Sequence, residues 1–352
     1  MKKNFGIGLM FNLLVGLIIA TFTGGGAFAA VGIGAGLSAI KTGTEGLQMA
    51  IQKEIWENDI VEALWANNQF LQYAFNADQY VLAGKVVHIP QQGTSVSVTT
   101  NRSSYPATVT TRTDTEINYS LDELTSDPVR IPNADTVELS YDKRNSVLTD
   151  TKSAIAEAGA LNLLFKWNPT AAANIIRTTG AAIAAHTDSA TGNRKAFGVA
   201  DVKAANKQFN KWNMPTTDRY MLLDADMYDQ LMSDLSATQY RDFSASLDQS
   251  NGVVGKLYSF NIMQRSAVAR YTNATTPVPI AWTTAGAAAD NAAAICWHKN
   301  SVERALGVVN FFENLGDPTF YGDIYSALVR LGGRIRRSDA KGILAIVQAA
   351  TA

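Results

Sequence analysis

Residues 85–139 restrict the fold most, because they read as one long β arm with polar side chains on both faces. β-Branched and small polar residues alternate with period two over 94–100 and again over 108–113, and turn-forming residues separate the two runs at 101–106. Such a ribbon has few large apolar side chains with which to build a core of its own. A two-stranded ribbon is only marginally stable in water, so we expect this arm to pack on another molecule.

The composition excludes several classes of protein. The chain has 352 residues, which is enough for roughly two domains or one large elaborated domain. A net charge of −1 argues against a broad electrostatic surface for nucleic acid. Cys296 is the one cysteine, so no intramolecular disulfide can form. His88, His186 and His298 lie in separate segments without ligand-like spacing, and no metal site is expected.

Residues 1–48 form a long apolar extension, in which no charged residue follows Lys2 and Lys3 until Lys41. A basic start, an apolar stretch and an Ala-x-Ala site at 27–29 are typical of a cleavable secretory signal, and the length would also permit a membrane span. A third interpretation starts the soluble protein at Met49, directly before charged, helix-like residues. Whether this extension is cleaved, retained or a mis-assigned start stays open.

Three helical regions are predicted from apolar residues at helical spacing. Broken spacing over 51–75 predicts short helices, and a continuous apolar stripe over 138–167 predicts one long helix that Asn168-Pro169 ends. A further helix is predicted over 199–212. The long helix is the strongest of these predictions.

Apolar runs predict strands at 219–223, within 256–270 and at 292–298. Asp224 follows the first of these strands and is expected to cap the next helix, with Asp226 favourably placed in its first turn. Helix, strand and helix in succession predict a small α/β layer within a chain of the α+β class.

The order of these parts resembles the major capsid proteins of tailed bacteriophages with the HK97-type fold. The phrases most similar to that family are residues 255–262, 294–299 and 321–325, the last leading to Gly332-Gly333-Arg334. The resemblance rests on part order and loose phrases over roughly residues 50–350, whereas the extension at 1–48 departs from the family pattern.

The resemblance also implies a division of the chain. The parts are an apolar or signal-like extension (1–48), an N-arm (49–84), an extended β arm or E-loop (85–139), a P-domain with a spine helix (140–194), an inserted α/β A-domain (195–290), and P-domain return strands with the C-terminus (291–352).

By the same resemblance, the chain is expected to be a structural protein that assembles with copies of itself, as hexamers and pentamers, into an icosahedral shell around viral DNA. No catalysis and no cofactor are expected. Scaffold, portal and decoration proteins are further implied partners, and packaged DNA would be contacted only non-specifically. The implied location is the virion, assembled in the host cytoplasm. The alternative is an exported or membrane-anchored β-rich surface protein, supported by the signal-like residues 1–30.

Two groups of residues are candidates for contacts between subunits. The arm tip offers polar and turn-forming side chains with almost no apolar residue for an intramolecular core, and the C-terminal region offers a basic cluster whose other interpretation is a solvated strand face. The candidates are Thr99, Asn101, Arg102 and Tyr105 at the tip, and Arg334, Arg336 and Arg337 in the cluster.

An enzyme ranks third among the hypotheses, because no group of residues in the sequence supports a reaction. Asp224 and Asp226 could form an acid–base pair, but helix capping accounts for both carboxylates. Cys296 lies between Ile295 and Trp297 in a predicted strand, where a buried inert thiol is the better interpretation than a nucleophile.

We expect residues 1–48 not to be integral to the folded and assembled protein, because an uncharged run from Asn4 to Ile40 exposed on a soluble surface would promote aggregation. Expression from Met49 alone should therefore give a folded subunit that assembles as the full chain does, by circular dichroism and electron microscopy. Failure of the shorter chain, with rescue by the full chain, would show that the extension is structural and would favour a membrane-associated protein.

Overall fold

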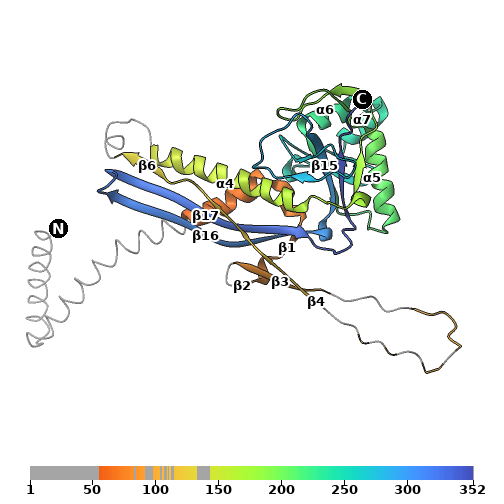
Figure 1. Cartoon of the computed structure of the whole chain (residues 1–352), viewed down its shortest axis with the longest axis horizontal. Helices are drawn as coiled ribbons and strands as arrows, with labels where there is room; N and C mark the ends of the chain where they lie inside the picture. Colours follow the sequence, from red (N-terminus) through yellow and green to blue (C-terminus); the bar gives the residue numbers. More distant parts are fainter. Residues whose placement is uncertain are drawn as a thin grey trace, which may run out of the picture. The chain divides into compact units, whose positions relative to one another are not determined.

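The structure is a computed structural model, and it describes residues 55–82, 85–91, 98–103, 105, 106, 109, 111, 115–132 and 143–351. The predicted extension at 1–48 lies outside these residues. The chain divides into two compact units, Met1–Asp59 and Ile60–Ala352. In the first unit the described residues 55–59 are helical, and the second unit holds the sheets (Figure 1).

The second unit opens with helical residues 60–67, which agrees with the short helices predicted there. The elements before residue 198 are η1 (Gln69–Tyr73), β1 (Phe75–Asn76), η2 (Asp78–Tyr80), β2 (Val81–Leu82), β3 (Val86–Gln91), β4 (Thr115–Ser120), β5 (Asp122–Thr125), β6 (Val129–Pro132), α4 (Lys143–Trp167), η3 (Ala172–Asn174), β7 (Ile175–Arg177), β8 (Ala182–Ala184) and β9 (Asn193–Lys195).

The remaining elements are α5 (Val199–Lys211), β10 (Arg219–Asp224), α6 (Ala225–Asp234), α7 (Ala237–Ser244), η4 (Gln249–Asn251), β11 (Gly255–Leu257), β12 (Phe260–Arg265), β13 (Ala269–Tyr271), β14 (Pro279–Ile280), β15 (Asn291–His298), η5 (Lys299–Ser301), β16 (Val302–Asp317), β17 (Gly322–Ile335) and β18 (Ile343–Val347). The mixture confirms the α+β class.

The base of the predicted arm is an antiparallel ribbon. Strand β3 pairs with β4 from Val86 opposite Ser120 to Gln91 opposite Thr115, and β2 pairs with the other edge of β3. Val87 is fully buried in a small apolar cluster with Ala77, Leu121 and Ala305. The ribbon is therefore held at its base by a local core, as an element that projects from a domain must be.

The C-terminal part of the predicted range 85–139 does not belong to this ribbon. Strands β5 and β6 pair instead with β17, in a sheet with β16 and β1. Two apolar residues account for the difference, because Ile131 is buried in this sheet and the Leu124 side chain lies against α4 near Gly159. Burying these two side chains stabilises the fold more than extending a solvated ribbon would.

The long helix α4 runs along β17 and ends at Trp167, directly before Asn168-Pro169, as predicted (Figure 1). Gly159 permits the close approach, because a Cβ there would lie 3.0 Å from the Leu331 side chain. The buried face is rotated from the predicted stripe. Leu148, Ile155 and Leu164 of the predicted stripe are buried, but Leu161 and Phe165 of the same stripe are half-buried, and Leu163 outside it is fully buried.

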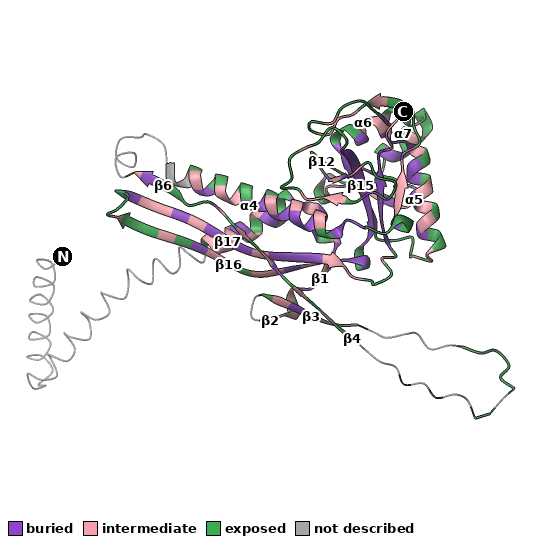
Figure 2. Cartoon of the chain, in the orientation of Figure 1, coloured by how far each residue is buried: buried purple, intermediate pink, exposed green. Residues whose placement is uncertain are grey.

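Beyond α4 lies an eight-stranded sheet in the order β11-β12-β10-β15-β13-β14, with β18 between β15 and β7. All residues of β10 and β15 are buried, which confirms the predicted buried strand at 219–223 and the strand at 292–298 (Figure 2). Helices α5 and α6 pack their apolar faces on this sheet through Val202, Phe209, Met227 and Leu231.

The predicted boundary between A-domain and return strands, at residues 290 and 291, lies directly before β15 and so divides the strands of one sheet. Both β15 and β18 come from the C-terminal range 291–352 yet pair with β10, β13 and β7. Strand β15 leads into β16 through the short helix η5, although the two strands belong to different sheets. The order of the elements along the sequence therefore does not reveal which strands pair.

An aromatic junction joins the end of α4 to the eight-stranded sheet. Trp167 and Trp297 are both fully buried, with ring centroids 5.8 Å apart. Trp167 Nε1 donates to the Glu303 carbonyl at 3.0 Å, and Trp297 Nε1 donates to the Tyr73 carbonyl at 2.9 Å. Each indole N–H thus has the partner that its burial requires.

We expect Leu222→Ala to lower the free energy of unfolding by roughly 2–5 kcal/mol, because it leaves a cavity in a packed core. Leu222 is 1% exposed in the middle of β10. Tyr240→Ala, at a side chain that is 53% exposed on α7, should change stability by about 0.5 kcal/mol or less. Denaturant titration compares the two variants with the parent, and equal midpoints for all three would show that β10 is not central to the core.

Candidate functional site

The predicted arm-tip residues are solvent-exposed. Thr99, Asn101, Arg102 and Tyr105 are all exposed, Tyr105 at 80% of its surface. Asn101 has a φ of 50°, which fits the turn predicted here. The Arg102 guanidinium lies 3.5 Å from Thr99 Oγ1, at the outer limit of a hydrogen bond. The tip therefore presents a cation and an aromatic ring whose surfaces its own chain leaves open.

The predicted basic residues are instead engaged within the chain. Arg334 Nε lies 2.6 Å from Glu303 Oε1, and Glu303 is fully buried. Arg336 Nε is 3.9 Å from Glu303 Oε2, and its guanidinium stacks 3.8 Å from the centre of the Phe75 ring. A buried carboxylate must have a cation beside it, so these two arginines serve the fold in the first place.

Arg337 pairs with Asp339 through two hydrogen bonds, each 2.8 Å long. This bidentate contact holds the pKa of the Asp339 carboxyl well below its usual range. The pair lies on the surface, where it is worth little to stability. Of the three predicted basic residues, Arg337 is thus the one in an exposed ion pair.

The far end of the β16–β17 hairpin carries a group of exposed apolar side chains. They are Phe312, Leu315, Phe320 and Tyr321. Figure 2 shows β16 changing from buried to exposed toward this end. The sequence prediction missed these residues. The available signal was the placement of Phe320 and Tyr321 directly after the turn-forming residues 316–318, where polar side chains are usual.

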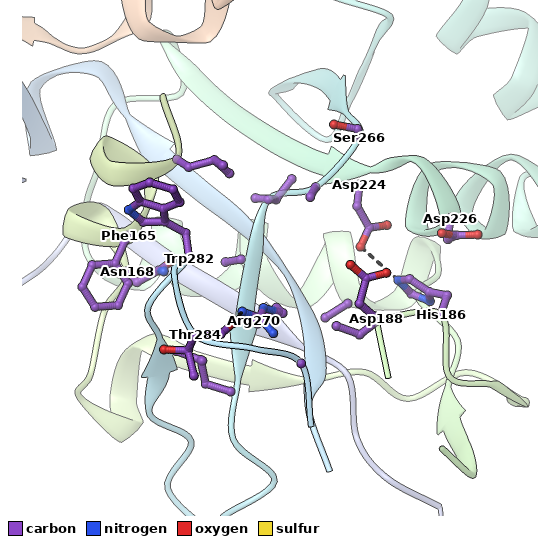
Figure 3. Close-up of a pocket in the computed structure, with 18 of the residues that line it drawn as sticks. Phe165, Asn168, His186, Asp188, Asp224, Asp226, Ser266, Arg270, Trp282 and Thr284 are labelled. Carbon is purple, nitrogen blue, oxygen red and sulfur yellow. Dashed lines mark hydrogen bonds and ion pairs between the residues drawn. The ribbon is translucent and has the colours of Figure 1, made fainter. Parts of the chain in front are cut away.

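A cavity of about 500 Å³ lies between the end of α4 and the eight-stranded sheet (Figure 3). At one end His186 Nε2 lies 3.0 Å from Asp224 Oδ2, while Asp224 Oδ1 accepts a hydrogen bond from Met227 N at 2.6 Å. The cap predicted for Asp224 is confirmed. Its contact with His186 was missed, because the two residues are 38 positions apart in the sequence.

The electrostatics at this end of the cavity favour positive charge. Burial opposes protonation of His186, but the hydrogen bond that His186 donates to Asp224 and the negative charges of Asp224 and Asp226 outweigh it and raise the His186 pKa. Asp226 and Asp188 also line the cavity and are exposed (Figure 3). The opposite end is apolar and aromatic, with Phe165 and Trp282.

The described residues that were considered as nucleophile or metal ligands do not form a reactive arrangement. Cys296 is fully buried, as predicted, and burial raises the pKa of its thiol, which opposes the thiolate form needed for nucleophilic attack. Within the described part of the chain, no group of three histidine, cysteine or acidic side chains could hold a metal ion. Nor does any helix of the described residues have the length and apolar character needed to cross a bilayer.

Comparison with known proteins gives no match to a family model and none to a curated protein. Solved structures do match. The capsid of Ralstonia phage GP4 superimposes with a TM-score of 0.58 at 13% identity, over 80% of this chain and 88% of the other. The capsid of cyanophage P-SCSP1u gives 0.54 at 18% identity, over 80% and 87%. This chain has the HK97-type capsid fold.

In this capsid fold, the two predicted groups of contact residues do not form one site. The arm tip is exposed at the end of a ribbon, whereas Arg334 lies against a buried carboxylate. The exposed hairpin end and the cavity are two further, separate features that the structure reveals.

We expect Arg334→Ala to lower the free energy of unfolding of the capsid-fold chain by about 3–5 kcal/mol. Without Arg334, the buried Glu303 carboxylate keeps only Arg336 as a nearby cation among the described residues, at 3.9 Å. Arg337→Ala removes only a surface pair and should cost less than about 1 kcal/mol. Denaturant midpoints of the unassembled subunit give both values. Equal, small losses would assign Arg334 to the surface and return it to the set of contact residues.

Proposed function

We propose that this chain is the major subunit of an icosahedral shell that encloses viral DNA, built from many copies of the chain and without catalytic chemistry. The proposal rests on one observation: a single copy leaves both an apolar hairpin end and an arm exposed. The likeness of the fold to phage capsids supports it.

The hairpin end is poorly suited to a monomer. Phe312, Leu315, Phe320 and Tyr321 lie within ten residues of one hairpin, and Tyr321 is 77% exposed. Contiguous exposed apolar side chains mark interaction surfaces. A second copy is the natural cover, since obligate interfaces between identical subunits resemble a domain core cut in two.

The arm is likewise suited to contacts between copies. Its base is fixed by the buried Val87, while its tip exposes side chains that make no core. A ribbon with free edges and exposed side chains can lie along another subunit and pair with it. In a shell of this fold the arm would lie over the neighbouring subunit, and copies would meet as hexamers and pentamers.

Partners other than copies of this chain have less support. Arg334 and Arg336 are occupied by Glu303, and the net charge of the chain is −1, so contact with packaged DNA would be weak and non-specific. Scaffold, portal and decoration proteins are proposed partners of the shell in a virion assembled in the host cytoplasm. The exported alternative has no support beyond the signal-like residues 1–30, which lie outside the described part of the chain.

We expect deletion of residues 99–105 to leave a soluble folded subunit that fails to form closed shells. The reason is that these exposed residues contribute nothing to the subunit core but are available to a neighbour. Electron microscopy of the purified protein reads shell formation, and the denaturant midpoint reads folding. Normal shells from the shortened chain would show that the arm tip is not an assembly element, and absence of shells from the full-length parent would refute the shell itself.

A further inference from the structure

The cavity beside α4 carries more negative than positive charge. Asp188 and Asp226 present exposed carboxylates at one end, and neither forms an ion pair with another residue in the described part of the chain. Asp224 is shared between His186 and the cap of α6. The Arg270 guanidinium at the cavity wall is held by Asp290 at 3.2 Å. Among the described residues, neither carboxylate therefore has an ion-pair partner of its own at the acidic end, although the charge of Asp226 also acts on His186.

The other end of the cavity leaves one buried acceptor without a donor from the described residues. Asn168 is 7% exposed, lines the cavity and has a buried side-chain oxygen without a donor among the described residues. A buried acceptor of this kind calls for a partner. Trp282, 37% exposed, and Phe165 form an apolar wall at the same end (Figure 3). The complementary ligand is thus rich in donors, positively charged and partly aromatic.

A guanidinium group has this chemistry, because it carries five N–H donors and no acceptor. The arm tip offers such a group in Arg102, and an aromatic ring three residues later in Tyr105. Both side chains are exposed in their own chain. Tyr105 follows Arg102 by three residues, so one arm tip can present both the guanidinium and the ring to the same cavity.

Resting on the proposed shell, we propose that the arm tip of a second copy of this chain occupies the cavity. The Arg102 guanidinium binds the carboxylates of Asp188 and Asp226, and the Tyr105 ring packs against Trp282. Charge complementarity selects this occupant, because the exposed cation at the tip lies between two carboxylates that form no ion pair among the described residues. The cavity is then the receiving site for the element whose loss should prevent shell closure.

A zero-length crosslink tests the contact directly. Arg102→Lys keeps the charge and supplies an amine, which a water-soluble carbodiimide joins to a neighbouring carboxylate as an amide. Assembled shells are mixed from isotope-labelled and unlabelled copies of the full chain, and mass spectrometry identifies the joined peptides. We expect links from position 102 to Asp188 or Asp226 between copies. Arg241→Lys, on the exposed face of α7, is the matched control and should give no link to these residues.

Three results would overturn the inference. Shells that contain no link from position 102 to Asp188 or Asp226 would place the arm tip elsewhere and leave the shell proposal intact. Links from another lysine to Asp188 and Asp226 would identify a different occupant, such as a segment near Lys2 or Lys41. A parent chain that forms no shells at all would refute the proposed function, and the cavity contact with it.

Charge-removal variants give a second measurement that does not depend on assembly of Arg102→Lys. Arg102→Ala, and Asp188→Asn combined with Asp226→Asn, should each lower the yield of closed shells by about tenfold, and all three changes together should lower it no further. Effects that multiply, or a yield unchanged by the two asparagines, would show that these groups do not contact each other.

Discussion

The structure depends on the satisfaction of two buried indole N–H groups. Trp167 and Trp297 pack against each other at the junction between α4 and the eight-stranded sheet, and each must find an acceptor away from water. Both use backbone carbonyls, of Glu303 and Tyr73, which lie at the start of β16 and the end of η1. The two indoles thereby connect the start of β16 and the end of η1 to the eight-stranded sheet.

Charge is used in the same region to hold the hairpin to its surroundings. The Glu303 carboxylate is buried where β16 begins, and Arg334 from β17 and Arg336 just beyond it lie against its two oxygens. Two of the three predicted basic residues therefore close the base of the hairpin. The exposed apolar hairpin end, the arm tip and the exposed carboxylates at the cavity remain available for partners. The proposed assembly thus relies on apolar burial at the hairpin end and on a small number of directed charges, rather than on a broadly charged surface.

Local patterns in the sequence predicted the elements with a strong internal signal. The helix that ends at Trp167, the buried strand at 219–223 and the Asp224 cap each depend on neighbouring residues, and all three are confirmed. Pairing between distant segments was not predictable in this way. The attachment of β5 and β6 to β17 and the contact of His186 with Asp224 join segments far apart in the sequence, and nothing in either segment names its partner. The exposed Phe320 and Tyr321 were missed because hydrophobic residues are expected to be buried, and only the structure shows that nothing in the described chain covers them.

Because Val87 anchors the arm within its own chain, the free energy of folding is separate from the free energy of association between copies. In many oligomeric proteins the two are coupled. The ribbon base is held by a core that is complete within one subunit, while the tip adds nothing to that core. A subunit can therefore fold fully before it meets another copy, and changes at the tip can alter association without altering folding. In the proposed shell, individual contacts between copies can then remain weak and reversible during growth, so that a misplaced copy dissociates intact and can be used again.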